Sequence, residues 1–260
     1  MSQPVPAVLD GRRALVTGGS RGIGRAIALA LARAGADVVV NFRERESEAS
    51  AVAAEVRALG RKAATVRGDT SKPDDVARFV DEAAAILGSI DLLVNNAGVL
   101  ARTPFLEVTE SEWDRTMATN LKGYFLVGQA VARRMTAAGI AGTIVNVSSS
   151  VEALAAPRVT SYAVSKAGVA MLTKQMALEL APHRIRVNSV CPGLVETDLN
   201  RADLSDADFR ARRLSRIPLG EIGSPDDIAS AVVFMSSTSG ARLVTGASLY
   251  VDGGKSIWSG

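Results

Sequence analysis

Two side chains in the segment YAVSK are spaced for proton chemistry. Tyr162 and Lys166 stand four residues apart in a stretch whose apolar and small residues repeat at helical intervals, so both belong to one helix face. A free tyrosine has a pKa of about 10, and a neighbouring ammonium lowers that pKa by favouring the phenolate. The pair could therefore serve as a general acid and base. The structural alternative is that Tyr162 packs and Lys166 reaches past it to water.

A glycine-rich segment near the N-terminus is suited to a phosphate. The letters TGGSRGIG occupy residues 17–24, follow a short apolar run and open a helical pattern. Glycine lets the backbone of a tight turn approach a pyrophosphate, and the helix N-terminus offers free N–H groups and partial positive charge. The spacing GxxxGxG differs from the commoner GxGxxG fingerprint. The segment nevertheless indicates a dinucleotide site.

The end of the second apolar run bears on which dinucleotide binds. At the position where NAD-binding proteins carry an acidic residue for the ribose 2′-hydroxyl, this chain has Phe42, and Arg43 follows. Arg21 in the glycine turn can point to the same place, and two guanidiniums suit a 2′-phosphate. Our hypothesis is that NADP(H) is preferred. Glu44 and Glu46 leave NAD(H) as the alternative, because either could bind a ribose diol.

The elements that must position these groups alternate along the chain. Strands alternating with helices predict βαβ units and a parallel sheet, and strands that are apolar throughout predict helices on both faces. We therefore predict one domain over residues 1–260, an α/β Rossmann fold with a seven-stranded, mostly parallel, doubly wound sheet. The strands are expected near 14–18, 37–42, 62–68, 91–96, 142–148, 185–190 and 248–253. The helices are expected near 22–34, 46–59, 73–87, 110–138, 161–181 and 225–236.

One segment interrupts this alternation. Residues from about 193 to 220 are rich in charge and poor in strand signal. An insertion of this length in a compact domain is commonly a lid over a binding site. We predict a substrate lid here, with a solvated pair of surface helices as the alternative.

Composition narrows the class of protein. The chain is 47% hydrophobic and 22% charged, with net charge +3 and one cysteine, Cys191, to which we assign no role. No intrachain disulfide can form, which agrees with a reducing, cytoplasmic location. We find no signal-peptide core and no membrane-length apolar run, and basic residues do not cluster with aromatics, so we expect neither a membrane nor a nucleic-acid partner. No metal-binding cluster is visible, and His183 is expected to be structural or solvent-facing.

Five motifs in this order resemble the short-chain dehydrogenase/reductase family almost end to end. They are residues 17–24, the letters NNAG at 95–98, YAVSK at 162–166, PG at 192–193 and the closing VTGASLYVDGG. The resemblance implies that residues 192–197 hold the nicotinamide carboxamide, through the Val195 backbone and the Thr197 hydroxyl. The predicted cofactor contacts are Gly18, Ser20, Arg21, Gly22, Ile23, Gly24, Phe42, Arg43, Asp69, Thr70, Asn96, Ala97, Gly98, Tyr162, Lys166, Pro192, Gly193, Val195 and Thr197.

The resemblance also implies individual roles, each with a structural alternative. Asp69 would accept from the adenine amino group, or could instead cap the helix that starts at Pro73. Residues 95–98 would back the adenine ribose and steady the sheet, although Asn95 could be only a turn residue.

The catalytic set follows from the same resemblance. Ser149 lies thirteen residues before Tyr162, the family's usual interval, although Ser148 and Ser150 flank it. Asn120 would hold a water of the proton relay, or could be a structural amide that bends its helix. With Tyr162 and Lys166, these residues complete the predicted catalytic set.

The implied reaction is hydride transfer between NADP(H) and a small carbonyl or secondary-alcohol substrate. Substrate contacts are expected from residues 99–105, from 151–158 and from the lid. Glu152 could accept from sugar hydroxyls, as in the sugar dehydrogenases of the family, whereas the lid arginines would suit the phosphopantetheine or acidic carrier of 3-oxoacyl-carrier-protein reductases. Those arginines are Arg210, Arg212, Arg213 and Arg216.

Two further expectations concern class and assembly. The same fold can serve as a non-enzymatic NADP(H)-binding sensor or scaffold, although such proteins typically lose the tyrosine or the lysine. The resemblance also implies a homotetramer, with the helices near 110–138 and 161–181 pairing between subunits.

Overall fold

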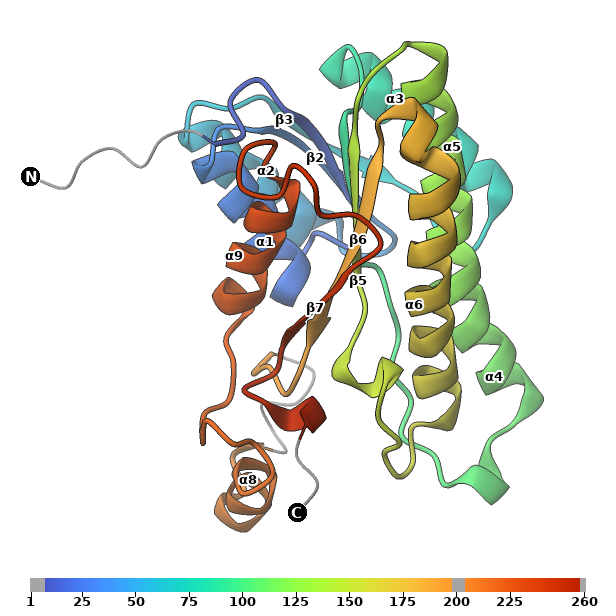
Figure 1. Ribbon diagram of the computed structural model, residues 1–260, viewed down its shortest axis with the longest axis vertical. Coiled ribbons are helices and arrows are strands. Elements are labelled where there is room, and N and C mark those ends of the chain that lie inside the picture. The colour runs from blue at the N-terminus through green and yellow to red at the C-terminus, as the bar shows by residue number, and fades with distance from the viewer. Residues whose placement is uncertain (1–7, 198–203, 258–260) are drawn as a thin grey trace, which may run out of the picture.

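A seven-stranded parallel sheet in the order β3-β2-β1-β4-β5-β6-β7 runs through the molecule (Figure 1). The computed structural model describes residues 8–197 and 204–257. The order reverses between β1 and β4, which leaves a crevice at the carboxyl ends of the strands. The predicted α/β Rossmann sheet is confirmed. The strands are β1 (Arg13–Val16), β2 (Asp37–Phe42), β3 (Ala63–Arg67), β4 (Leu92–Asn95), β5 (Thr143–Val147), β6 (Arg186–Pro192) and β7 (Ser248–Val251).

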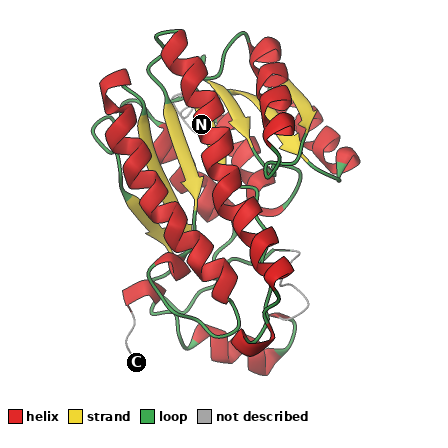
Figure 2. Ribbon diagram, turned by 90° about the vertical axis from the view of Figure 1, so that its right-hand side faces the viewer, coloured by secondary structure: helices red, strands yellow, loops and turns green. Residues whose placement is uncertain are grey.

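Helices cover both faces of this sheet. One layer holds α1 (Gly22–Arg33), α2 (Glu46–Ala58) and α9 (Pro225–Ser236). The other layer holds α3 (Pro73–Leu87), α5 (Gly123–Ala137) and α6 (Thr160–Leu180), and Figure 2 shows the long helices of that layer in front of the strands. Successive strand residues alternate between faces, so Val16 joins the first core and Leu15 the second.

The predicted helix 110–138 is interrupted. It consists of α4 (Glu110–Met117), a π-helical segment η2 (Ala118–Lys122) and then α5. A π-turn inserts extra backbone into a helix and is common at functional sites. Here it carries the fully buried Asn120. Apolar periodicity continues across the segment, so spacing alone did not reveal it.

A buried polar network connects the strands to α6. Asn95 at the end of β4 donates to the Asn146 Oδ1 atom on β5 (3.0 Å), and Asn146 donates to the Thr173 hydroxyl on α6 (2.9 Å). Buried amides are costly unless they are paired, so this chain of bonds fixes α6 against the sheet. Asn95 therefore steadies the sheet, as predicted, and is more than a turn residue.

The segment predicted to be a lid packs against the carboxyl end of the sheet. It contains α8 (Ala207–Leu214), whose first turn is capped by the Asp206 carboxylate accepting from the Phe209 N–H. Leu194, Leu204 and Ile217 form a small buried cluster beneath it. Residues 198–203 of the predicted lid lie outside the described residues, and the function as a lid stays a prediction.

Within the described residues, none of the helices combines the length and the apolar character that crossing a membrane requires. His183 is exposed in the short helix η4 (Ala181–His183), which agrees with a solvent-facing residue. The same residues hold no group of three or more His, Cys, Asp or Glu side chains arranged to bind a metal ion.

Candidate active site

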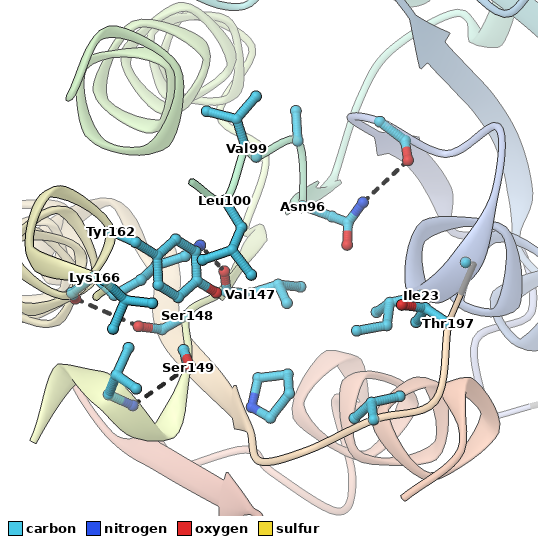
Figure 3. A pocket seen from close by; sticks show the side chains of 18 of the residues that line it. Ile23, Asn96, Val99, Leu100, Val147, Ser148, Ser149, Tyr162, Lys166 and Thr197 are labelled. Atoms are coloured by element: carbon cyan, nitrogen blue, oxygen red, sulfur yellow. Dashed lines mark hydrogen bonds between the residues drawn. The ribbon is translucent and has the colours of Figure 1, made fainter. Parts of the chain in front are cut away.

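One large cleft, about 1090 Å³ in volume, opens at the carboxyl ends of the strands. Every predicted cofactor contact lines it, as does Ser149. In Figure 3, Tyr162, Lys166 and Ser149 lie on one side of the cleft, whereas Ile23 and Thr197 lie on the other. Residues far apart in sequence thus meet because parallel strands end at one edge of the sheet.

The Tyr162–Lys166 pair lies at the start of α6, one helical turn apart. The Lys166 side chain is only 3% exposed, which rules out the alternative in which it reaches water. Its Nζ atom donates to the Val147 carbonyl (2.8 Å) and to the Tyr124 hydroxyl (3.3 Å). The ammonium lies 5.8 Å from the centre of the Tyr162 ring. It is therefore a fixed, nearly dry positive charge beside the phenol.

The electrostatics of the pair differ from the sequence-based expectation. Burial lowers the pKa of Lys166 to about 8, although the negative charge of Glu152 opposes this shift. Burial also raises the pKa of Tyr162, and a hydrogen bond between the Ser149 hydroxyl and the phenol lowers it in part. The predicted lowering of the Tyr162 pKa by Lys166 is wrong for the protein without cofactor. Desolvation dominates because the ammonium donates to the Val147 carbonyl and the Tyr124 hydroxyl, not to the Tyr162 phenol.

The three consecutive serines have different environments. Ser149 begins the short helix η3 (Ser150–Glu152), and its Oγ atom accepts from the Val151 N–H (3.4 Å) and hydrogen-bonds with the Tyr162 phenol. The Ser148 hydroxyl instead donates to the Lys166 carbonyl (3.4 Å), and Ser150 is 1% exposed. Of the three, Ser149 is the one whose hydroxyl stands beside the phenol in the cleft.

Asn120 does not line the cleft. Its Oδ1 atom accepts from the Val99 N–H (2.8 Å), and its Nδ2 atom donates to the Val99 carbonyl (2.9 Å) and the Ser165 hydroxyl (3.2 Å). Both ends of the amide are engaged by protein groups, and the role of Asn120 in holding a relay water stays a prediction. Asn120 instead fixes the loop after β4 against the residue that precedes Lys166.

The glycine turn is held by close backbone packing. A Cβ atom at Gly24 would lie 2.2 Å from the Gly18 carbonyl oxygen and 2.5 Å from the Asn96 amide nitrogen, so no larger residue fits. The Asn96 amide donates to the carbonyls of Thr17 (3.0 Å) and Gly18 (3.1 Å). Within the part of the chain that the structure describes, no side chain caps the N-terminus of α1, and the first turn of this helix carries no acidic residue. Free N–H groups therefore face the cleft, as an anion site requires.

The corner beyond β2 combines one buried and several charged residues. Phe42 lines the cleft but belongs to the core and is only 3% exposed, so it offers little surface to a ligand. Arg43 forms ion pairs with Glu44 (2.7 Å) and Asp69 (3.8 Å). Asp69 also accepts from the Ser71 N–H (2.9 Å). The Asp69 carboxylate therefore orders the turn before α3, although Lys72 occupies the cap position of that helix.

The segment after β6 closes the cleft above α1. Gly193 packs so tightly on Asp252 that a Cβ atom would lie 2.6 Å from its Cα atom. Val195 forms a parallel bridge with Gly223. Thr197 reaches the glycine turn, where its Cγ2 atom would lie 3.8 Å from a Cβ at Gly22. The backbone of this segment is thus fixed on both sides.

Comparison with known proteins decides the family. A family model described as Enoyl-(Acyl carrier protein) reductase matches residues 18–256, most of the chain. The chain belongs to the short-chain dehydrogenase/reductase family. The predicted family and the predicted enzyme class, oxidoreductase, are thereby confirmed.

Relatives of this short-chain dehydrogenase/reductase act on different substrates. The L-rhamnose 1-dehydrogenase (NAD(P)(+)) of Azotobacter vinelandii is 43% identical over 250 residues, which cover 95% of this chain and 97% of that protein. The 3-oxoacyl-acyl-carrier-protein reductase FabG of Staphylococcus epidermidis is 41% identical and covers 94% and 98%. The solved structure of a gluconate 5-dehydrogenase from Burkholderia cenocepacia, in complex with NADP and tartrate, has a TM-score of 0.90, 42% identity and 96% coverage of both chains.

The substrate end of this dehydrogenase/reductase bears on one predicted residue and adds another. Glu152 is not among the residues that line the cleft, and its Oε1 atom accepts from the Tyr250 hydroxyl on β7 (3.0 Å). Its Oε2 atom is buried without a hydrogen-bond partner among the described residues, and the expectation that Glu152 accepts from sugar hydroxyls stays a prediction. Lys255, in the short helix η5 (Lys255–Ile257), does line the cleft and was not predicted. Its signal was weak, since it follows the final strand after only Asp252 and two glycines.

Proposed function

We propose that this enzyme transfers hydride between NADP(H) and a secondary alcohol or carbonyl, with Tyr162 as the proton donor and acceptor. The observation that carries the proposal is the meeting of the Tyr162 phenol, the Ser149 hydroxyl and the buried Lys166 ammonium on one wall of the cleft, opposite the glycine turn. An acid, a hydrogen-bond donor and a fixed cation are what reduction of a carbonyl needs.

The residues present fit a phosphorylated dinucleotide. Uncapped N–H groups at the start of α1 would hold the pyrophosphate, and Arg21 and Arg43 would hold a 2′-phosphate. When bound, the cofactor supplies or accepts the hydride at its nicotinamide ring. The backbone of Val195 and the hydroxyl of Thr197 would hold the carboxamide of that ring, and Asp69 the adenine amino group.

Each catalytic residue has one task in this proposal. Ser149 donates a hydrogen bond to the substrate oxygen, where negative charge develops during reduction. Tyr162 gives its proton to that oxygen and takes it back in the reverse direction. Lys166 holds the ribose of the nicotinamide and keeps positive charge beside the phenol. Asn120 acts as a positioning residue through Val99 and Ser165.

A substrate panel tests this proposal. NADPH oxidation would be followed with ketones and 3-oxoacyl thioesters, and NADP⁺ reduction with aldoses, alditols and sugar acids. Turnover of at least one carbonyl or alcohol is expected. Tight NADPH binding without any turnover across the panel would instead support a sensor, and the proposal would be abandoned.

The preference for NADP(H) is tested at Arg43. Arg43→Ala is expected to lower kcat/KM for NADPH by about 10- to 100-fold, because a charged hydrogen bond is worth about 1.5–3 kcal/mol. The value for NADH should change little. Arg33→Ala, which removes an exposed arginine from the last turn of α1, is the control for the change in net charge. Equal losses for both cofactors would contradict a 2′-phosphate contact.

We also propose a homotetramer built through α5 and α6. Three apolar residues seven apart, Val164, Met171 and Leu178, line one side of α6 and are 42%, 59% and 71% exposed. A stripe of this kind on a long helix is typical of a subunit contact. Light scattering should give the mass of four chains, and a monomer would remove the proposal.

We propose that the enzyme acts in the cytoplasm. Its one thiol, Cys191, is buried, and burial raises its pKa to about 12. A protonated, buried thiol is unreactive, and a single thiol forms no intrachain disulfide, which agrees with a reducing compartment. Fractionation of cells would test the location.

A further inference from the structure

Positive charge dominates the wall of the cleft. Among the residues that the structure describes, nine lysine and arginine side chains line it against two carboxylates, Glu44 and Asp69. Both carboxylates lie at the cofactor end, beyond β2 and β3. Of the described residues, none at the substrate end contributes a carboxylate to the wall.

Cations from four separate segments line this end of the cleft. Arg102 follows β4, Arg158 follows η3, Arg213 and Arg216 lie in and just after α8, and Lys255 belongs to η5. The helix η5 packs against η3, the turn that begins directly after Ser149. Gly253 and Gly254 in turn pack against Ile217 and Pro218. Lys255 therefore lies between the segment after α8 and the catalytic serine.

Electrostatic repulsion acts between these cations. Burial lowers the pKa of Arg213, and repulsion from Arg102 and Arg216 lowers it further. Burial likewise lowers the pKa of Lys255, with added repulsion from Arg213 and Arg216. The Asp252 carboxylate counters part of this but already accepts from the N–H groups of Gly254 and Ser256. Like charges held together in a partly buried cleft are unfavourable unless an anion binds between them.

The arginines of α8 divide into two groups. Arg210 pairs with Glu196 (3.5 Å) outside the cleft, and Arg212 is exposed and does not line it. Arg213 points inward and stacks on the Phe209 ring (5.8 Å to its centre), and Phe209 packs on the small cluster under α8. The inward guanidinium is therefore held by packing, whereas an acidic carrier protein would meet Arg210 and Arg212 on the outer surface.

We propose that the substrate is a small oxyanion, a hydroxy acid or a phosphorylated sugar, whose anionic group binds Arg213 and Lys255 while its alcohol or carbonyl faces Tyr162 and Ser149. This proposal rests on the proposed function. Arg21 and Arg43 remain for the cofactor phosphates, so Arg213 and Lys255 are available for a different anion.

Matched pairs of substrates test the proposal. Aldonates would be compared with alditols of the same configuration, and aldose phosphates with the free aldoses, by NADP⁺ reduction. We expect kcat/KM to be at least about 100-fold higher for the anionic member of one pair, and the pair that shows it identifies carboxylate or phosphate. Equal turnover of neutral and anionic members, or a clear preference for 3-oxoacyl thioesters on a carrier protein, would overturn this inference alone. No turnover with any compound would overturn the proposed function as well.

Substitutions test whether Arg213 and Lys255 bind the anionic group of the substrate. Arg213→Gln and Lys255→Gln are expected to raise KM for the anionic substrate about 10- to 100-fold, the value of a hydrogen bond to a charged group, with little change in kcat. Arg213→Lys should recover part of the loss. Arg212→Gln, on the same helix but outside the cleft, is the matched control and should leave KM unchanged.

The same variants separate substrate from cofactor. Kd for NADPH, measured by its fluorescence, should stay within about twofold of the wild-type value. A rise in that Kd without a rise in substrate KM would mean that these cations serve the cofactor phosphates, and the inference would fail. Because both side chains border solvent, the variants are expected to fold, which thermal melting would check.

Discussion

Tyr162→Phe is expected to lower kcat by about 10²–10⁴-fold, the usual contribution of a positioned general acid. The change removes one oxygen atom and leaves the ring that packs at the start of α6. Ser149 still donates to the substrate oxygen, but no group of similar acidity can reach it, because Lys166 is committed to Val147 and Tyr124. Folding and NADPH binding should therefore survive while proton transfer fails.

The chain has three tyrosines, and one of the other two supplies the control. Tyr250→Phe removes a hydroxyl that, among the described residues, bonds to Glu152 outside the cleft, so kcat should stay within about twofold of wild type. For alcohol oxidation by the wild type, kcat/KM should rise with pH above neutrality, because the phenolate is the base and burial raises the Tyr162 pKa. Residual activity in Tyr162→Phe should lack that rise. Wild-type rates in this variant would remove Tyr162 from the mechanism.

The features that were predicted correctly depend on short-range sequence. Tyr162 and Lys166 share a helix face because they are four residues apart, and the glycine turn follows from glycines placed between a strand and a helix. The sheet followed from alternating apolar runs. These arguments need only local geometry and the rule that parallel strands end together.

The features that were missed depend on contacts between distant segments. The pKa of Tyr162 is set by burial that only the packed fold creates. The Asn120 amide forms hydrogen bonds with Val99 and Ser165, which lie in other segments. The π-turn that positions Asn120 does not change the apolar periodicity of the sequence. Glu152 turns to Tyr250, about a hundred residues away in sequence. Sequence spacing identifies which residues can act, whereas the partners of each polar atom require the structure.

Lys166→Met is expected to inactivate the enzyme and yet to stabilise the fold. The loss of activity should be about 10²-fold or more, since the variant lacks both the charge beside the phenol and the ribose contact. The gain in stability follows from burial. A lysine whose pKa falls from 10.5 to about 8 on folding destabilises the folded state by about 3 kcal/mol while it is charged.

The hydrogen bonds lost with the ammonium reduce this gain only in part. The Val147 carbonyl still accepts from the Tyr124 hydroxyl (2.9 Å), so no buried acceptor is left without a partner. Methionine also matches the length and flexibility of the lysine stem. We expect the free energy of unfolding at pH 7, measured with urea and without cofactor, to rise by about 1–3 kcal/mol.

The dependence of this gain on pH identifies its origin. Below pH 8 the lysine is protonated in both the folded and the unfolded chain, and the full cost of burying its charge is present. Between pH 8 and about 10.5 the folded chain binds fewer protons than the unfolded chain, so the wild type becomes more stable as the pH rises. The advantage of Lys166→Met should therefore shrink across that range, whereas Lys174→Met, an exposed change two turns further along α6, should show no such trend. A variant less stable than wild type at pH 7 would mean that the ammonium is held by interactions stronger than its desolvation. The cofactor-free site would then already be optimal for folding, instead of giving up stability to keep a charge in place for catalysis.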